Sequence, residues 1–191
     1  MGRLQAAALE LFAEQGFERT TVAEITQRAG LTTRTFFNHF TDKREVLFKP
    51  LSGMQKEVVT RGIADCSTAL SPLDAVLTGL QAAADELFEE RRAAVRRRQG
   101  IIEANPELLE RELGKRAALT DTMAAALRAR GLDHDDALLI ARVGALVHQT
   151  AMQRWTESTD ERPLREFLTD AMCSLRAVVS RDESGVSTRQ H

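Results

Sequence analysis

Apolar residues near the start of the chain recur at intervals of three and four, the spacing of one face of a helix. One such face collects Leu4, Ala8, Leu11 and Phe12. Gly16 follows this run, and a glycine just beyond the last periodic residue is a common helix C-cap. The pattern predicts an amphipathic helix that ends near Gln15.

The next predicted helix opens with a capping box. Thr21 and Glu24 are three residues apart, so the threonine hydroxyl can accept the Glu24 amide while the glutamate accepts the amide of Thr21. Gly30 can adopt the left-handed conformation that a tight turn needs. The second helix is therefore predicted to be about two turns long, from Val22 to Ala29.

Two more short helices are predicted before residue 50. Thr32 or Thr33 can cap the third, whose buried face would hold Phe36 and Phe40. The run Asp-Lys-Arg-Glu at 42–45 gives another cap signal and opens the fourth. Four helices thus fit within the first fifty residues.

Beyond Pro50 the periodic segments lengthen. Proline removes an internal helical hydrogen bond, so a kink or break is expected near Lys49, either at a domain boundary or as an early helix end. Ser71-Pro72 and Asn105-Pro106 each mark a helix start. The remaining helices are predicted at about 51–68, 72–92, 93–104, 106–130, 135–157 and 163–180.

These elements predict an all-α protein of about nine helices. A three-helix helix-turn-helix domain at 1–49 would be joined to a larger helical bundle domain at 50–181. Residues 182–191 are polar, lack an apolar periodicity and are predicted to form a flexible tail. Composition agrees, because the 191 residues include only 4 Pro and no Tyr, which favours helix over sheet.

Composition also excludes several classes of protein. A formal net charge of −2 with 28% charged residues excludes a histone-like polycation and a disordered tail. Cys66 and Cys173 cannot build a disulfide-dense or four-cysteine zinc framework, which indicates a reducing compartment. No apolar run has the length of a membrane span or the form of a signal peptide. We therefore expect a soluble, cytoplasmic protein that does not associate with a membrane.

The second and third predicted helices have the spacing of a helix-turn-helix, with a glycine in the turn between them. Opposite its buried phenylalanines, the third helix carries a face rich in hydrogen-bond donors and poor in negative charge: Thr32, Thr33, Arg34, Thr35, Asn38 and His39. This chemistry favours DNA recognition over ordinary helix pairing.

Three runs in this region carry a resemblance to a known family. They read Thr20-Thr21-Val22-Ala23-Glu24-Ile25, Ala29-Gly30-Leu31-Thr32, and Thr35-Phe36-Phe37-Asn38-His39-Phe40-Thr41-Asp42-Lys43-Arg44-Glu45-Val46-Leu47. Together they resemble the signature of the tetracycline-repressor (TetR) family of bacterial transcription regulators. The resemblance implies a homodimeric repressor that binds a near-palindromic operator on double-stranded DNA and releases it when a small-molecule effector binds the C-terminal domain.

The resemblance also implies roles for individual side chains. Thr21 and Lys43 match positions that grip phosphate at helix starts, and His39 matches one that contacts the DNA backbone. The groove-facing set would be Thr32, Thr33, Arg34, Thr35 and Asn38, with Arg34 the best candidate for a two-pronged contact to guanine.

Phe37 departs from the family pattern, which has a tyrosine there whose hydroxyl reaches a phosphate. Phe37 can still pack against a sugar or a thymine methyl group. The family's basic extension ahead of the first helix is also reduced here to Arg3.

The small net charge hides an uneven distribution. Residues 1–49 carry seven basic and six acidic side chains, and the rest of the chain is net negative. Between residues 28 and 44, four basic residues face only Asp42, which predicts a basic patch and a DNA affinity that falls steeply with salt.

Two segments near the C-terminus resemble the helix pair of the family's four-helix dimer bundle. Segment 135–157 places apolar or small residues at helical spacing at Ala137, Ala141, Gly144, His148, Ala151, Met152 and Trp155. Segment 163–180 does so at Leu164, Phe167, Leu168, Ala171, Leu175 and Val178. A homodimer would pack through 135–157 and 163–180; the alternative is packing within one subunit.

An effector, expected to be largely apolar, would bind among the helices from 72 to 157. Its cavity walls would come from Phe88, Met123, Leu127, His148, Met152 and Trp155, although each is also a candidate for ordinary core. A cluster at Arg91, Arg92, Arg96, Arg97 and Arg98 offers a site for an anionic effector such as an acyl thioester of coenzyme A, or else a solvated helix face.

A helical enzyme is the rival class. The sequence contains no Glu-x-x-His pair, no His-Glu-x-x-His, no P-loop and no dinucleotide fingerprint. Asp133-His134-Asp135-Asp136 could chelate a metal ion but is better explained as a helix N-cap. We therefore expect no catalysis, cofactor or metal site, while a transcriptional activator or an effector-less regulator remains an alternative to a repressor.

Overall fold

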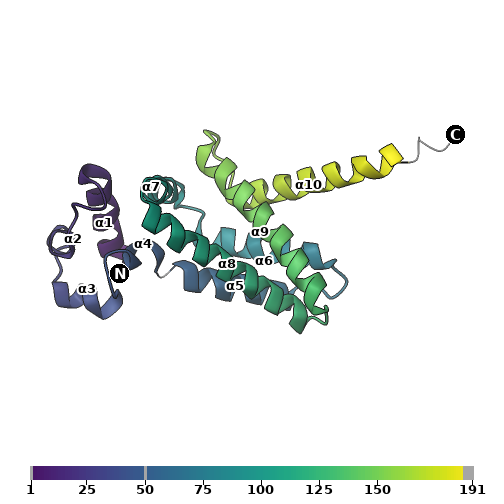
Figure 1. Cartoon of the computed structure of the whole chain (residues 1–191), viewed down its shortest axis with the longest axis horizontal. Helices are drawn as coiled ribbons and strands as arrows, with labels where there is room; N and C mark the ends of the chain where they lie inside the picture. The colour runs from purple at the N-terminus through teal and green to yellow at the C-terminus, as the bar shows by residue number, and fades with distance from the viewer. Residues whose placement is uncertain (1, 50, 187–191) are drawn as a thin grey trace. The chain divides into compact units, whose positions relative to one another are not determined.

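A computed structural model describes residues 2–49 and 51–186, with side chains up to residue 180. Within these ranges the chain is all-α, as predicted, and forms ten helical segments, one of them a single turn (Figure 1). They are α1 (Gly2–Gln15), α2 (Val22–Ala29), α3 (Thr33–His39), α4 (Glu45–Phe48), α5 (Leu51–Asp65), α6 (Pro72–Leu87), α7 (Arg92–Glu103), α8 (Pro106–Ala129), α9 (His134–Glu157) and α10 (Leu164–Val186).

The local start and stop signals act as predicted. Thr21 and Glu24 form both hydrogen bonds of a capping box at the start of α2, and Gly30 ends this helix with φ 62°. Thr32, one of the two candidates, caps α3 by accepting the Thr35 amide at 3.1 Å. These ends were readable because each depends on residues within one turn.

The region around Pro50 interrupts the helical path. α4 begins after Asp42, whose Oδ1 accepts the Glu45 amide at 2.9 Å. Lys49 has extended dihedral angles, and α5 begins at Leu51. Helical geometry therefore stops just before Pro50, a residue that itself lies outside the described ranges.

The last helix is longer than predicted. α10 continues to Val186, so the part of the predicted tail from 182 to 186 is helical. Apolar periodicity fades there, but no proline intervenes and the charged residues that follow Ser180 are compatible with a helix. The rest of the predicted tail, 187–191, lies outside the described residues.

The described chain forms two compact units. Of the described residues, unit 1 comprises 2–49, 51–54 and 91–117, and unit 2 comprises 55–90 and 118–186. Unit 1 is thus larger than the domain predicted at 1–49, because α7 and the first half of α8 belong to it.

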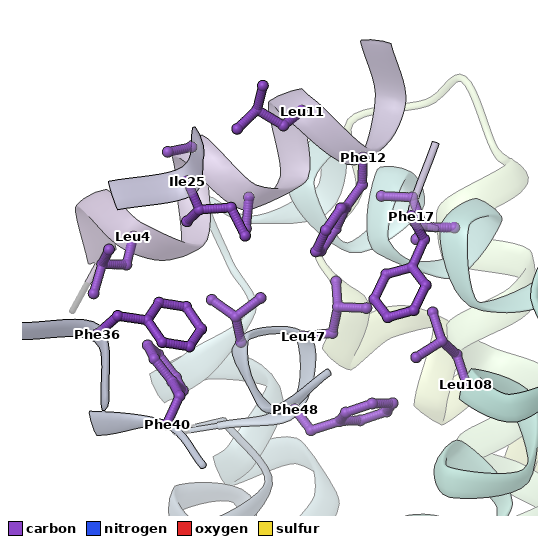
Figure 2. Packing of buried hydrophobic residues seen from close by; sticks show 14 of the residues in the cluster. Leu4, Leu11, Phe12, Phe17, Ile25, Phe36, Phe40, Leu47, Phe48 and Leu108 are labelled. Atoms are coloured by element: carbon purple, nitrogen blue, oxygen red, sulfur yellow. The ribbon is translucent and has the colours of Figure 1, made fainter. Parts of the chain in front are cut away.

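Unit 1 has a single apolar core that explains this membership (Figure 2). Phe12 from α1, Ile25 from α2 and Phe36 from α3 belong to this core, and so do side chains that come from much later in the chain. Among the latter are Ile102 of α7 and Leu108 of α8, which are 2% and 0% exposed. Burying these residues attaches the two later helices to the N-terminal ones.

Unit 2 is built around closely packed helices. α5 and α6 approach at two glycines, where a Cβ on Gly62 would lie 2.7 Å from the Cα of Gly79. α6, α9 and α10 pack on one another, and the C-terminal part of α10 extends past the other helices of the unit (Figure 1). Across residues 2–49 and 51–186, no helix combines the length and apolar character needed to cross a bilayer.

Candidate nucleic-acid interface

The two faces of α3 have opposite character. Phe36 and Phe40 are buried at 0% and 1% exposure, with ring centroids 5.1 Å apart, and they anchor the helix in the core of unit 1. Six of the predicted DNA-contacting residues on and next to this helix are exposed: Thr32, Thr33, Arg34, Phe37, Asn38 and His39. The fold therefore presents one rigidly anchored face of donors and one aromatic ring.

Thr35 is placed differently from the rest of the predicted set. It is half-buried, and its hydroxyl lies 2.9 Å from the hydroxyl of Thr32. Both hydroxyls therefore serve the start of α3. These bonds help to fix the start of the helix.

Phe37 is the exposed aromatic residue of this face. Its side chain is 58% exposed, and its ring meets the ring of Phe36 edge-on, with centroids 5.4 Å apart. The edge contact holds the ring in place while leaving much of its surface free. This geometry suits the predicted packing against a sugar or a methyl group.

Thr21 lies at the start of α2, and Glu24 occupies much of its hydrogen-bonding capacity. The Glu24 carboxylate accepts from the Thr21 amide at 2.7 Å and from the Thr21 hydroxyl at 2.8 Å. These bonds hold the pKa of Glu24 below its ordinary value, so the carboxylate is ionised at neutral pH. A phosphate approaching here meets amides at the N-terminus of α2 that lie beyond the box.

Lys43 does not project as a free phosphate ligand. Its ammonium nitrogen lies 2.8, 3.1 and 3.2 Å from the carbonyl oxygens of Phe17, Glu18 and Thr20. The phosphate grip by Lys43 stays a prediction, and in this structure the side chain is turned onto the turn between α1 and α2.

The predicted basic patch between residues 28 and 44 is weaker than its sequence suggests. Arg28 pairs with Glu14 at 2.9 Å, and Arg44 pairs with Asp42 at 3.2 Å. Lys43 is engaged by backbone carbonyls. Among the four cations of this stretch, only Arg34 has no ion pair or hydrogen bond with the described residues. A count of charges along the sequence did not reveal these pairings, because each partner is brought close by a tertiary contact or by a local turn.

α4 is held to α7 and α8 by ionic and polar contacts inside unit 1. The Arg98 guanidinium donates to the carbonyl of Leu47 at 2.7 Å and to the Glu112 carboxylate at 2.6 Å. Burial raises the pKa of Glu112, but Arg98 and Arg116 lower it further, and the net pKa is below the ordinary value. Arg98, predicted within a cluster for an anionic effector, thus has a structural role.

The predicted effector residues fall in unit 2 with core-like burial. Phe88, Met123, Leu127 and Trp155 are at most 3% exposed. His148 is half-buried, and its Nε2 lies 3.2 Å from the Gln55 amide nitrogen, a polar pair between α9 and α5. Met152, also half-buried, is one turn from His148.

A hollow of about 480 Å³ lies in a different place, inside unit 1 between the end of α1 and α7. Phe12, Phe17 and Ile101 contribute apolar surface to it, and Arg19 and Arg97 also line it. None of the six predicted effector residues reaches this hollow.

Asp133 acts as the predicted N-cap. Its carboxylate accepts from the amides of Asp135 and Asp136 at 2.9 and 3.0 Å. Within the described ranges, no three His, Cys, Asp or Glu side chains gather as a metal ion requires.

The apolar stripe predicted to form the dimer on α9 faces inward instead. Ala137, Ala141, Gly144 and Ala151 are buried, and a Cβ on Gly144 would lie 2.4 Å from Val76 of α6. Small residues at these positions therefore let α9 approach α6 within one subunit. Other apolar side chains of α9 and α10 are exposed, by 62% at Leu139, 57% at Leu146, 61% at Val178 and 56% at Val179.

The segment that contains α3 is similar to the DNA-binding segment of known regulators. Residues 4–49 match the family model described as bacterial regulatory proteins of the tetR family. The HTH-type transcriptional regulator TcmR of Streptomyces glaucescens is 29% identical over 180 residues, which cover 88% of this chain and 79% of that protein.

Solved structures share the fold over most of the chain. The SmeT–triclosan complex has a TM-score of 0.63 at 21% identity, covering 91% of this chain and 90% of that one; SmeT is the repressor of the SmeDEF multidrug efflux pump of Stenotrophomonas maltophilia. The TetR-family repressor FadR of Thermus thermophilus, in complex with lauroyl-CoA, has a TM-score of 0.50 at 26% identity, covering 90% of both chains. The N-terminal match, the long alignment with TcmR and the shared fold together make this chain similar to DNA-binding transcriptional regulators of the TetR family.

Proposed function

We propose that this protein is a homodimeric, ligand-responsive repressor that binds a near-palindromic operator. The observation that carries the proposal is the exposed donor face of α3, fixed to the core by Phe36 and Phe40 on its opposite side. A helix of this kind can enter the major groove, where donors and methyl contacts distinguish base pairs.

Arg34 is the proposed base-reading residue. Its guanidinium is exposed and can present two parallel N–H groups to the O6 and N7 atoms of guanine. Thr33 and Asn38 complete the groove-facing surface, while Thr21 and His39 are proposed to contact the DNA backbone.

The exposed apolar residues of α9 and α10 support a homodimer. Leu139 and Leu146 are seven residues apart and so lie on one face of α9, two turns from each other. Val178 and Val179 lie near the C-terminal end of α10 and are likewise exposed. Pairing these surfaces across a two-fold axis would bury them and give two α3 helices for a two-fold operator.

A largely apolar effector is proposed to bind in unit 2. FadR of Thermus thermophilus was solved with lauroyl-CoA and SmeT with triclosan, and both ligands have large apolar parts. His148, Met152 and Trp155 share one face of α9, where the Gln55–His148 pair provides a polar group for orienting a ligand. Phe88, Met123 and Leu127 are the other proposed wall residues.

Selection from a random duplex library tests the proposed function. Purified full-length protein is expected to enrich a motif with two inverted half-sites, about one helical turn apart or a multiple of it. Enrichment of a motif without inverted symmetry would contradict the dimeric operator, and the absence of any enriched motif would contradict specific DNA binding.

A further inference from the structure

The turn between α1 and α2, residues 16–21, is held by a side chain from much later in the chain. The Lys43 ammonium contacts the carbonyl oxygens of Phe17, Glu18 and Thr20, and it lies 4.3 Å from the centre of the Phe17 ring. A lysine ammonium has three N–H donors. Three carbonyls and an aromatic face therefore already satisfy its charge and its donors.

Hydrogen bonds within the turn itself also hold its backbone. Gly16 has φ +87°, and the Thr20 hydroxyl, in a side chain that is 1% exposed, donates to the Gly16 carbonyl at 2.8 Å. The Gln15 amide donates to the Thr20 hydroxyl at 3.3 Å. The turn that leads into α2 at Thr21 is thus held by bonds to Gly16, Phe17, Glu18 and Thr20.

We propose that Lys43 is a positioning residue for DNA binding, which fixes the start of α2 through the 16–21 turn and does not itself bind a phosphate. The inference rests on the proposed DNA-binding function and assigns a different role to one residue of that site. A phosphate could recruit the Lys43 ammonium only by displacing a carbonyl of the turn that places Thr21 and the N-terminus of α2.

The geometry also explains why lysine suits this position. Three acceptors converge on one atom, which a compact ammonium can satisfy. The planar guanidinium of an arginine spreads its donors and cannot place one nitrogen at that point with the same contacts. Charge alone should therefore not replace Lys43, which separates a positioning role from a phosphate contact.

The test measures operator dissociation constants over a series of salt concentrations by fluorescence anisotropy. The full-length proteins are wild type, Lys43→Met, Lys43→Arg, Thr20→Val and Arg34→Gln. Thr20→Val loosens the same turn without a change in charge, and Arg34→Gln removes a cation proposed to lie on the DNA. Val59→Ala, a core truncation in unit 2, is the control for lost stability, and all proteins are measured well below their melting temperatures.

A positioning role predicts that Lys43→Met and Lys43→Arg both weaken operator binding about tenfold or more, because contacts at the start of α2 are misplaced. Thr20→Val should weaken it in the same direction. The slope of log K against log salt should stay within about half a unit of wild type for these variants, whereas Arg34→Gln should reduce it by about one unit. Val59→Ala should keep the wild-type affinity despite a lower melting temperature.

Two outcomes would overturn the proposal. One is wild-type affinity in Lys43→Arg together with a slope reduced by about one unit in Lys43→Met, the signature of a phosphate contact. The other is wild-type affinity in both Lys43→Met and Thr20→Val. If Lys43→Met does not fold, Lys43→Arg and Thr20→Val still decide between the roles. Equal binding of operator and scrambled DNA by the wild-type protein would instead reject the underlying DNA-binding function.

Discussion

At the scale of single residues, the DNA-facing surface depends on which side chains remain available after folding. Arg28 and Arg44 are paired with carboxylates, and Lys43 is engaged by carbonyls, although the sequence presents all of them as free cations. Arg34 stays exposed on α3. A local motif therefore predicted the exposed polar face of α3, whereas the partners of Arg28 and Lys43 could not be predicted because they come from non-local contacts.

Replacing Arg34 should test the reading role directly. Arg34→Ala should lose about 1–3 kcal/mol of specific binding and relax the preference at one base step, because a two-pronged contact to guanine is removed. Competition binding against operators mutated at single positions measures both effects. A variant that keeps the affinity and selectivity of the wild-type protein would show that Arg34 is not a base reader.

At the scale of helices, local signals and packing signals differed in how well they could be predicted. The caps at Thr21, Thr32 and Asp133 were readable from sequence because each involves residues within one turn. The small-residue stripe of α9 was correctly recognised as a packing face, and at Gly144 the structure shows packing within one subunit, which was the alternative to a dimer interface. It meets Val76 of α6 at Gly144, and periodicity alone cannot say whether a stripe faces its own subunit or another.

The approach of α5 to α6 makes Gly79 a sensitive position. Gly79→Ala should destabilise the protein by about 1–3 kcal/mol, because the added Cβ has no room. It would lie 2.7 Å from the Val59 carbonyl oxygen and 2.9 Å from Ile63 Cγ1. Chemical denaturation of the full chain measures the change.

Gly114→Ala is the matched control for this substitution. Gly114 lies inside α8 with nothing within 4 Å of an added Cβ, so alanine should stabilise the helix by about 0.5–1 kcal/mol. Equal effects of the two substitutions would contradict the close packing of α5 on α6.

The Arg98–Glu112 pair gives unit 1 a predicted acid sensitivity. The folded pKa of Glu112 is below its ordinary value, so the ionised carboxylate stabilises the fold fully above the unfolded glutamate pKa of about 4.3. This contribution is lost as the pH falls through the lower folded pKa. Glu112→Gln should therefore reduce the free energy of unfolding by about 1–3 kcal/mol at neutral pH, since it leaves the Arg98 charge without its carboxylate.

Thermal or urea unfolding between pH 7 and pH 3 measures this effect. The difference between wild type and Glu112→Gln should shrink towards the acid end. Glu14→Gln breaks an exposed pair with Arg28 and should change stability little. A difference that is constant across the pH range would contradict the role of the ionised pair.

At the scale of the whole molecule, the predictions of the fold class and of the family were correct. The division of the chain into two units was harder to predict from the sequence. The all-α class followed from helical periodicity, and the family from motifs within residues 4–49. The inclusion of α7 and the first half of α8 in unit 1 depends on Ile102 and Leu108 reaching the N-terminal core. Such a pairing across more than fifty residues leaves no periodic signal in the sequence.

The proposed dimer is testable through its exposed apolar residues. Leu139→Glu combined with Leu146→Glu should convert a dimer into monomers and strongly weaken operator binding, because charges would be buried in the interface. Light scattering after size exclusion measures the mass. Leu113→Glu, at a residue of α8 that is 55% exposed, is the control and should leave the dimer intact. A dimer that survives the double substitution would place the interface elsewhere.

The central claim, sequence-specific DNA binding through α3, is tested most directly by one comparison. The affinity of the full-length protein for its selected operator is measured against a scrambled duplex of the same length at about 150 mM salt. Binding to the operator is predicted to be tighter by about 10³-fold or more, and Arg34→Ala should lose a large part of that ratio. Equal affinity for the two duplexes, or a ratio that Arg34→Ala leaves unchanged, would contradict the account.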